Sequence, residues 1–313
     1  MEKILGPKVK DVSLRKNMQL SEFVKQIQAG GGFVAKKVGI AVNILERMER
    51  DKACVKFLSF PANVIATGCR GVIRDLVKEK LVDIVITTCG TLDHDLARSW
   101  KPYYHGNFQI DDAKLRRAGI NRLGNIFVPD ESYGLVLEEK MQPILETLWR
   151  TGKHEFSSRE LIWEFGRRIR SRRSILYWAW KNRIPIYVPG ILDGAFGSQV
   201  WLFWQDHRDF KLDQLRDEQE LADVVFRAKR TGALIIGGGI SKHHVLWWNQ
   251  FREGLDYAVY ITTAPEWDGS LSGARMREAV SWKKIKERAK YVTVEGDATV
   301  LLPLIIGALI ERL

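Results

Sequence analysis

The segment Ala233–His244 reads ALIIGGGISKHH, and its pattern decides the fold. Four apolar residues suit a buried strand, three glycines suit a tight turn, and the residues from Ser241 onward suit the start of a helix. Glycines let a backbone approach a phosphate closely, and free N–H groups at a helix start favour an anion. The segment is not a G-x-G-x-x-G motif, because Lys242 stands where the last glycine would be. It therefore predicts either a phosphate-binding loop or a plain tight turn.

The same pattern of strand, turn and helix recurs along the chain. The expected strands are Val55–Phe60, Val82–Thr87, Asn125–Val128, Ile184–Val188, Ala233–Ile236, Tyr257–Thr262 and Tyr291–Val294. Most of these runs are continuously apolar, which is typical of parallel strands covered by helices on both faces. We therefore predict an α/β fold, a Rossmann-like, mostly parallel, doubly wound sheet with helices on both faces. The small and polar residues at the strand ends can then converge on one ligand crevice.

Composition limits the class of protein. The chain has 313 residues, of which 45% are hydrophobic and 28% charged, as in ordinary globular proteins. Its three cysteines, at positions 54, 69 and 89, are too few for a disulfide framework and lack metal-knuckle spacing, so we expect a reducing cytoplasm and no metal. The most apolar stretch, 298–309, is shorter than the roughly 20 residues that cross a bilayer, so we expect a buried helix and no membrane partner.

No flexible linker divides the chain. We expect a helical N-terminal extension over residues 1–50 and a single α/β catalytic domain over residues 51–313. A second domain around 140–180, where the pattern is helical, is the alternative.

The charge balance points toward polyanions in general. The chain carries 49 Lys and Arg against 38 Asp and Glu, a net charge of +11. Its densest basic run lies between Arg167 and Arg173 and has aromatic neighbours, as a groove for single-stranded nucleic acid can have. However, Trp163, Ile169 and Leu176 fit one amphipathic helix whose other face is solvated arginine. We favour that interpretation, expect no nucleic-acid partner, and keep a nonenzymatic RNA-binding protein as an alternative.

A second group of polar residues follows the strand expected at Tyr257–Thr262. It comprises Glu266, Asp268, Glu278, Trp282, Lys283, Lys284 and Lys286. Carboxylates beside an indole suit a cationic ligand, and a lysine there is a candidate amine nucleophile. The spacing does not decide whether Lys283 or Lys284 is the nucleophile. On a regular helix Lys284 would point about 200° away from Trp282, so the helix must end or distort if these two side chains act together.

Adjacent histidines are the remaining candidates for chemistry. On a helix the side chains of His243 and His244 point about 100° apart, so the two cannot readily bind the same metal ion. A single histidine at the mouth of a crevice suits proton transfer near neutral pH, while a hydrogen-bonded structural histidine is the alternative.

Several motifs together resemble one enzyme family. They are TTCGTLDHDL, INRLGNIFVP, SILYWAWKNRIPIYVPGILDGAFG, LIIGGGISKHH, DYAVYITTAPEWDGSLSGARMREAVSWKKI and DATVLLPL, in family order from about Phe57 to Leu304. They resemble deoxyhypusine synthase, closest to its archaeal members. The resemblance implies NAD-dependent transfer of the 4-aminobutyl group of spermidine to one lysine of the precursor of translation factor 5A. It implies an enzyme-lysine imine, release of 1,3-diaminopropane, and a homotetramer with active sites at subunit interfaces.

The resemblance also assigns residues to the site. Lys284 would form the imine and His243 would be the base. The substrate-binding positions would be Glu278, Trp282, Asp93, Gly269, Ser270, Leu271 and Ser198. The NAD-binding positions would be Ala62, Asn63, Ala66, Thr88, Cys89, Gly90, His94, Asp193, Gly237, Gly238, Gly239, Thr263, Ala264, Asp268, Asp297 and Ala298.

Three of these positions depart from the eukaryotic pattern. His94 stands where an acid would contact the dinucleotide, and Ser198 and Leu271 stand where carboxylates would bind the amine. A homospermidine synthase-like transfer to putrescine or another polyamine is therefore a further alternative on the same scaffold.

Overall fold

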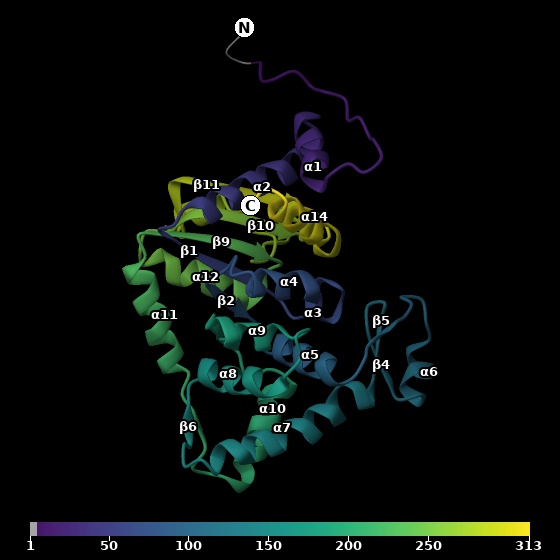
Figure 1. Ribbon diagram of the computed structural model, residues 1–313, viewed down its shortest axis with the longest axis vertical. Helices are drawn as coiled ribbons and strands as arrows, with labels where there is room; N and C mark the ends of the chain where they lie inside the picture. The colour runs from purple at the N-terminus through teal and green to yellow at the C-terminus, as the bar shows by residue number, and fades with distance from the viewer. Residues whose placement is uncertain (1–4) are drawn as a thin grey trace.

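A parallel sheet of six strands forms the centre of the computed structural model, which describes residues 5–313 (Figure 1). Its strands are β1 (Cys54–Phe60), β2 (Ile84–Thr87), β7 (Ile186–Tyr187), β9 (Arg230–Ile236), β10 (Leu255–Thr262) and β11 (Ile285–Glu295). Their order is β7-β2-β1-β9-β10-β11, and every neighbouring pair is parallel. The predicted parallel sheet is confirmed. The strand order reverses direction between β1 and β9, which is where an open α/β sheet leaves a crevice.

Helices cover both faces of this sheet. The helices α2 (Phe33–Arg50), α4 (Cys69–Lys78) and α14 (Ala298–Ile310) share one apolar core with the first face. The helices α11 (Leu215–Arg227) and α12 (Gly239–Gln250) share a second core with the other face. Successive strand residues point to opposite faces, so the continuous apolar runs feed both cores at once. The doubly wound arrangement follows from this composition.

Further helices stack beyond the β2 and β7 edge of the sheet. They are α5 (Cys89–Trp100), α7 (Gly134–Trp149), α8 (Ser158–Ile169), α9 (Ile175–Asn182) and α10 (Ala195–Asp206), and they fill the lower half of Figure 1. Helix α8 ends at Ile169, and Arg170 adopts a left-handed conformation with φ of 51°. The single amphipathic helix expected through Leu176 is therefore wrong, since the chain turns at Arg170 and begins α9 at Ile175.

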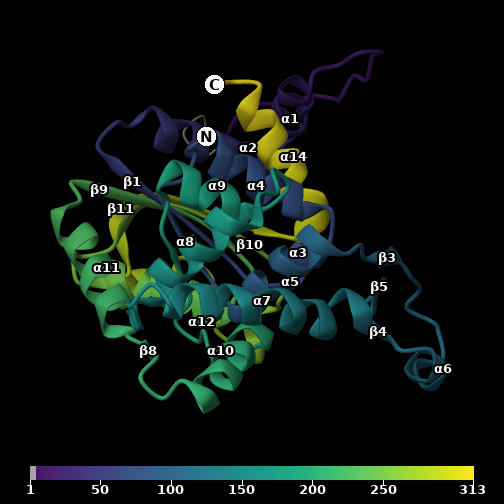
Figure 2. The same ribbon diagram turned by 60° about the horizontal axis from the view of Figure 1, so that its bottom comes forward.

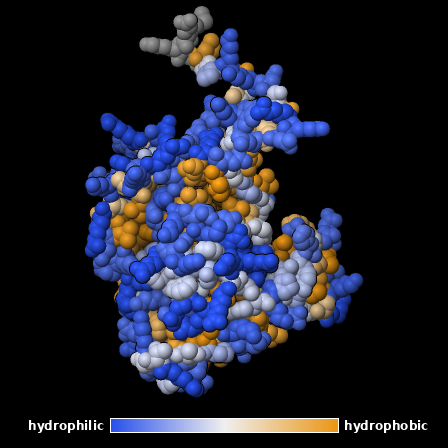
Figure 3. Space-filling view, in the orientation of Figure 1, coloured by the Kyte–Doolittle hydropathy of each residue, from blue (hydrophilic) through white to orange (hydrophobic). Residues whose placement is uncertain are grey.

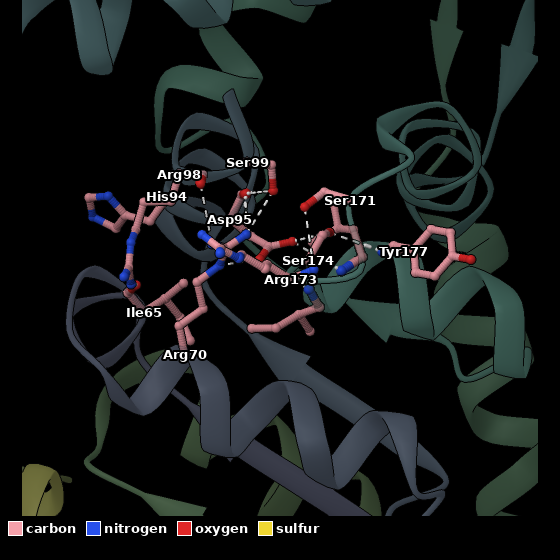
Figure 4. A network of polar contacts seen from close by, with 12 residues as sticks. Ile65, Arg70, His94, Asp95, Arg98, Ser99, Ser171, Arg173, Ser174 and Tyr177 are labelled. Carbon is pink, nitrogen blue, oxygen red and sulfur yellow. Dashed lines mark hydrogen bonds and ion pairs between the residues drawn. The ribbon is translucent and has the colours of Figure 1, made fainter. Parts of the chain in front are cut away.

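A buried polar network joins these helices (Figure 4). The Asp95 carboxylate on α5 accepts hydrogen bonds from Ser174 Oγ at 2.6 Å and from the N–H groups of Ile175 and Leu176 at 3.0 and 3.1 Å. It also pairs with the Arg70 guanidinium on α4 at 2.7 Å. A carboxylate at a helix N-terminus satisfies N–H groups that lack helical partners. Asp95 therefore fixes α9 against α4 and α5.

Residues 104–129 leave the body of the molecule as a small antiparallel sheet. Its strands are β3 (Tyr104–His105), β4 (Ile120–Leu123) and β5 (Ile126–Pro129), with α6 (Asp112–Arg117) between β3 and β4. The strand expected at Asn125–Val128 in the main sheet is thus wrong in its place. Only Gly124 and Asn125 separate β4 from β5, and a two-residue connection can join only antiparallel strands. Figures 1 and 2 show this unit projecting from the body, and Figure 3 shows hydrophobic residues on its surface.

The remaining elements are short or terminal. They are α1 (Leu20–Ala29), α3 (Asn63–Ala66), α13 (Glu278–Ser281), the 3-10 turns 130–132 and 266–268, and the paired strands β6 (Glu155–Phe156) and β8 (Lys211–Leu212). Helix α14 is the buried apolar helix expected near the end of the chain. Within residues 5–313, no helix combines the length and hydrophobicity needed to cross a membrane.

Candidate functional site

A crevice of about 400 Å³ opens at the carboxyl ends of β1, β9, β10 and β11. We call it the strand-end crevice. It is lined by Pro61, Asn63, Val64, Thr67, Phe108, Leu123, Gly124, Asn125, Ile126, Ile236, Gly237, Ile261, Thr262, Thr263, Gly296, Asp297, Ala298 and Thr299. It lies at the reversal of strand order, where nucleotides bind in folds of this type. The projecting β4–β5 hairpin forms its outer wall.

Five predicted cofactor residues line this crevice: Asn63, Gly237, Thr263, Asp297 and Ala298. Gly237 has φ of +63°, and a Cβ there would lie 3.1 Å from Pro61. Only glycine combines this backbone with so close an approach. The Asp297 carboxylate accepts a hydrogen bond from the Thr299 N–H at 2.7 Å and caps α14. A close-fitting glycine turn, a carboxylate and a helix start are groups that suit a dinucleotide.

Other predicted cofactor residues do not line the crevice but support the loop after β1 that does. Thr88 Oγ1 accepts a hydrogen bond from the Ala62 N–H at 3.1 Å, and a Cβ at Gly90 would lie 2.8 Å from the Cβ of Ala62. The start of α5 therefore holds the loop after β1. Ala66 is buried in α3.

Three residues of α5 have structural roles rather than the predicted ligand contacts. Cys89 is 1% exposed, and burial raises its thiol pKa to about 12. Asp93 is also 1% exposed, and its carboxylate accepts hydrogen bonds from the Ala195 N–H at 3.0 Å, the Phe196 N–H at 2.7 Å and a tyrosine hydroxyl. It holds the start of α10, and its burial raises its pKa. Asp93 thus lines neither the strand-end crevice nor the lysine cavity described below, and its contact with the amine stays a prediction.

His94 departs from its predicted place in the same way. Its Nδ1 lies 2.9 Å from the Tyr103 hydroxyl, and its ring packs against Tyr103 and Tyr133. Burial, assisted by the nearby Arg98 charge, lowers its pKa to about 4. His94 is thus a neutral core histidine and does not line the strand-end crevice. Seven successive residues of α5, from Thr91 to Ala97, are buried, so this helix has no exposed polar face there that its sequence pattern could indicate. Asp93, His94 and Asp95 are polar in sequence yet buried in the fold.

A second cavity of about 260 Å³ lies between α12 and the segment 269–284, and we call it the lysine cavity. It is lined by Lys242, Leu246, Gly269, Ser270, Leu271, Ala274, Arg275, Met276, Glu278, Ala279, Trp282 and Lys284. Six residues predicted for the amine site are therefore brought together here. Leu271, one of the three departures from the eukaryotic pattern, contributes an apolar side chain to this wall.

The chain direction at Lys284 is set by the end of α13. This helix stops at Ser281, and Lys283 has φ of 56° in the left-handed region. The Lys283 N–H donates to the Val280 carbonyl at 3.0 Å, and the Lys284 N–H donates to the Ala279 carbonyl at 2.9 Å. These two bonds form a Schellman turn. The helix therefore ends where our prediction required it to end.

This turn separates the two candidate lysines. Lys284 is half-buried, and its Nζ lies 5.2 Å from the centre of the Trp282 ring. Lys283 is exposed and lies outside the lysine cavity. The structure therefore favours Lys284 as the nucleophile.

The adjacent histidines also separate. His244 Nε2 lies 3.3 Å from the Glu218 carboxylate, to which the Trp248 indole also donates at 2.8 Å. His243 instead stacks on Trp247, and its pKa is lowered by burial and then by the charges of Lys284 and His244. His243 therefore keeps its base form to a lower pH than an ordinary histidine does. Within residues 5–313, no three His, Cys, Asp or Glu side chains cluster as a metal site.

The predicted residues do not meet at one point in a single chain. The strand-end crevice and the lysine cavity have no lining residue in common. Ser198 lines a third hollow of about 730 Å³ on α10, with Trp201 and Trp204, and Asp193 lies in the exposed loop before α10. The predicted site residues are therefore distributed over separate hollows in the single chain, while residues after β1, β9, β10 and β11 do share the strand-end crevice.

The glycine run and the loop after β10 separate the two cavities. Gly238 lies against Ser272, since a Cβ there would be 2.0 Å from Ser272 Oγ, whereas a Cβ on Gly239 would meet open space. Asp268 is exposed and accepts a hydrogen bond from the Ser270 N–H at 2.7 Å. The Ala264 carbonyl accepts one from Arg275 at 3.1 Å. These residues therefore order the loop rather than line the crevice.

Two charged residues of the lysine cavity, Lys242 and Arg275, were not among the residues predicted for the site. On α12, residues 242, 245, 246 and 249 are buried and share one face. A lysine in such a core stripe is the signal that could have identified Lys242. Arg275 carried no comparable signal, because its segment has no regular period.

Comparison with known proteins supports one family. Residues 22–309 match the family model for deoxyhypusine synthase. The chain is 55% identical over 308 residues to the "Probable deoxyhypusine synthase" of Picrophilus torridus, covering 98% of either chain. It is 46% identical over 316 residues to that of Ignicoccus hospitalis, covering 99% of this chain and 98% of the relative. A crystal structure from Entamoeba histolytica, provisionally described as a deoxyhypusine synthase, shares the fold with a TM-score of 0.65 at 22% identity over 96% of either chain.

Proposed function

Because the chain belongs to the deoxyhypusine synthase family, we propose that it transfers the 4-aminobutyl group of spermidine to a lysine of the translation factor 5A precursor. The observation that carries this proposal is Lys284, half-buried and held beside Trp282 in a cavity that Glu278 also lines. Membership of an enzyme family is at odds with the nonenzymatic RNA-binding alternative.

NAD fits the strand-end crevice. Asn63, Gly237, Thr263, Asp297 and Ala298 would hold it, with the Gly237 turn leaving room for close backbone approach. When bound, the dinucleotide supplies the uptake of a hydride from the amine and its return to the product. Because no net oxidation results, retention of the cofactor matters more than its rapid exchange.

Lys284 carries the transferred group. After hydride loss from the carbon beside the secondary nitrogen of spermidine, the Lys284 amine adds to that carbon and 1,3-diaminopropane leaves. The aminobutyl group is then joined to Lys284 as an imine. The acceptor lysine adds to the same carbon and displaces Lys284, and hydride return completes deoxyhypusine.

The neighbours of Lys284 bind the amine and move protons. Glu278 pairs with a cationic nitrogen, and the exposed face of Trp282 adds cation–π attraction. These local groups oppose the repulsion that a net charge of +11 exerts on a polyamine. In this proposal His243 accepts the amine proton, and its lowered pKa, to which the Lys284 charge contributes, supports that role.

A second copy of the chain completes the site in this proposal. In one chain the strand-end crevice and the lysine cavity share no lining residue, and the contact of Ser272 with Gly238 stands between them, whereas hydride transfer requires the amine carbon to approach the dinucleotide. Trp282 is 64% exposed and Trp267 is 89% exposed, and such large apolar groups suit a subunit interface. We therefore propose a cytoplasmic homotetramer whose active sites combine surfaces of two subunits, Ser198 being a candidate contribution from the neighbour.

The nucleophile can be tested by trapping. The protein is incubated with NAD and spermidine, reduced with borohydride and digested, and the modified lysine is located by mass spectrometry. We expect modification at Lys284, its loss in Lys284→Ala, and its retention in the control Lys286→Ala, where the lysine pairs with Asp256 instead. Modification at Lys283, or none at all, would contradict the proposal.

The acceptor can be tested with the same protein. Labelled spermidine is offered together with the factor 5A precursor or with putrescine. We expect label in the precursor protein. Label only in homospermidine would instead support the polyamine-transfer alternative, which uses the same lysine.

A further inference from the structure

The loop that forms one wall of the lysine cavity is held by side chains from its surroundings. Residues Leu271–Ala274 have no helix or strand of their own, yet each of their four carbonyls accepts a side-chain hydrogen bond. Lys242 Nζ donates to the Leu271 carbonyl at 2.6 Å and to the Ala274 carbonyl at 2.7 Å. It therefore spans the loop from its first residue to its last.

The other two carbonyls have their own donors. Thr262 Oγ1 donates to the Ser272 carbonyl at 3.0 Å, and the Tyr260 hydroxyl donates to the same oxygen. Arg275 Nη1 donates to the Gly273 carbonyl at 3.1 Å. Leaving the carbonyls of this loop without donors would raise the free energy of the folded protein, so the four donors favour one conformation of the loop.

Lys242 is buried where a lysine is uncommon. It is 1% exposed, and its Nζ lies 3.9 Å from the centre of the Tyr260 ring. Its hydrogens are thus directed at two carbonyls and an aromatic face. Burial lowers its pKa to about 7, although the nearby Glu278 charge opposes this shift. A neutral amine keeps two N–H donors, so the two carbonyl contacts persist on deprotonation.

We propose that Lys242 is a positioning residue that fixes the Leu271–Ala274 wall of the lysine cavity and so sets the site for the cationic substrate. Two lysines line this cavity, and they have different tasks. Lys284 is directed to the Trp282 face for chemistry, whereas the Lys242 amine is committed to the loop. This inference rests on the proposed function for the identity of the substrate, but the loop contacts themselves do not depend on it.

The wall also adjoins the strand-end crevice. Ser272 packs against Gly238, whose neighbour Gly237 lines that crevice. Lys242 lies in the first turn of α12, directly after this glycine run. The residue that fixes the amine wall is therefore built onto the turn that borders the proposed dinucleotide site.

Hydrogen exchange of the unliganded protein tests the loop contact directly. The Gly273 and Ala274 N–H groups both donate to the Ser270 carbonyl at 3.0 Å, so their exchange reports opening of the wall. In Lys242→Met, which has similar length and no donors, we expect at least about tenfold faster exchange there. Lys242→Arg should restore slow exchange, and Lys242→Gln, one atom shorter with two donors, should lie between them.

A second variant on the same helix serves as the control. Asn249→Leu removes a buried donor to the Val245 carbonyl without touching the wall. It should destabilise the protein while leaving exchange at residues 273 and 274 unchanged. Unchanged exchange in folded Lys242→Met, or equal acceleration in Asn249→Leu, would overturn the proposal; if Lys242→Met fails to fold, exchange in Lys242→Gln decides in the same way.

Kinetics connects the wall to the substrate. We expect Lys242→Met to raise the KM for spermidine at least about tenfold and to lower kcat less, because Lys284 is retained. A fall in kcat alone, with unchanged KM and unchanged exchange, would refute a positioning role. If even the unmodified protein transfers no aminobutyl group, the proposed function fails, while the exchange result still decides the role of Lys242.

Discussion

Replacing Lys283 tests whether the left-handed turn aims Lys284. Lys283 has φ of 56°, a region that costs an L-residue roughly 1–2 kcal/mol relative to glycine. Its side chain is exposed, so substitution removes little packing. Lys283→Gly should relieve backbone strain in the folded state, which stabilises the protein, and increase the conformational entropy of the unfolded chain, which destabilises it. Each effect is about 1 kcal/mol, so the two nearly cancel. Lys283→Val adds a β-branched side chain to the left-handed region and should destabilise by about 1–2 kcal/mol.

The consequence for chemistry should be larger than for stability. If the turn unwinds, the Lys284 amine loses its place 5.2 Å from the Trp282 ring, and a displacement of this kind can cost about a hundredfold in rate. Thermal unfolding and borohydride trapping measure the two effects. We expect Lys283→Gly to match the parent protein in both assays and Lys283→Val to fall in both. Full trapping and an unchanged Tm in Lys283→Val would refute this reasoning.

Three further outcomes follow from the site and its supports. Because the pKa of His243 is lowered, its base form should persist below pH 6.5, and His243→Gln should reduce kcat by about 10²–10⁴-fold and remove that acid limb from the pH profile. Buried His94 has a pKa of about 4, so stability should be complete above pH 6.5 and fall as pH drops toward 4; urea unfolding should show a smaller fall in His94→Gln. Gly237→Ala should weaken NAD binding about tenfold or more in titration calorimetry, since its Cβ would lie 3.1 Å from Pro61 in a left-handed backbone, whereas Gly134→Ala, with open space around it, should bind normally.

The main sheet was predictable because its strands are buried on both faces. Runs such as Val55–Phe60 and Tyr257–Thr262 are continuously apolar, and this composition leaves few other structures for a short segment. Strand β11 was predicted too short, as Tyr291–Val294. Its first half is polar and lies where the pairing with β10 shifts register, between the pairs Leu255–Ile285 and Tyr257–Lys290, so no apolar run marks it.

The β4–β5 hairpin shows how local chemistry can be overlooked. The apolar run predicts a strand at Asn125–Val128, but the Gly124-Asn125 pair is a hairpin turn and the strand begins at Ile126. Reading that dipeptide would have placed the strand in a separate antiparallel unit. The sequence therefore contained the information needed to place this strand correctly.

The buried acids and bases of α5 were beyond prediction from the residues alone. Asp93, His94 and Asp95 follow one another in a helix, and all three are buried against residues that come later in the chain. Asp93 is bonded by Phe196, His94 packs against Tyr103 and Tyr133, and Asp95 is bonded by Ser174. Sequence resemblance assigned two of them to ligands. Only packing shows that their oxygens and nitrogens already have protein partners.

The sequence by itself determined the parallel α/β sheet, the family and the candidate lysines, because apolar runs and ordered motifs are properties of the chain. The tertiary structure decided which lysine faces the indole, since this depends on a turn at one left-handed residue, Lys283. It also decided that Lys242 supports a wall and that Ser272 and Gly238 meet between the two cavities. These features depend on distances between residues far apart in sequence, and hydrogen bonds act only over about 3 Å.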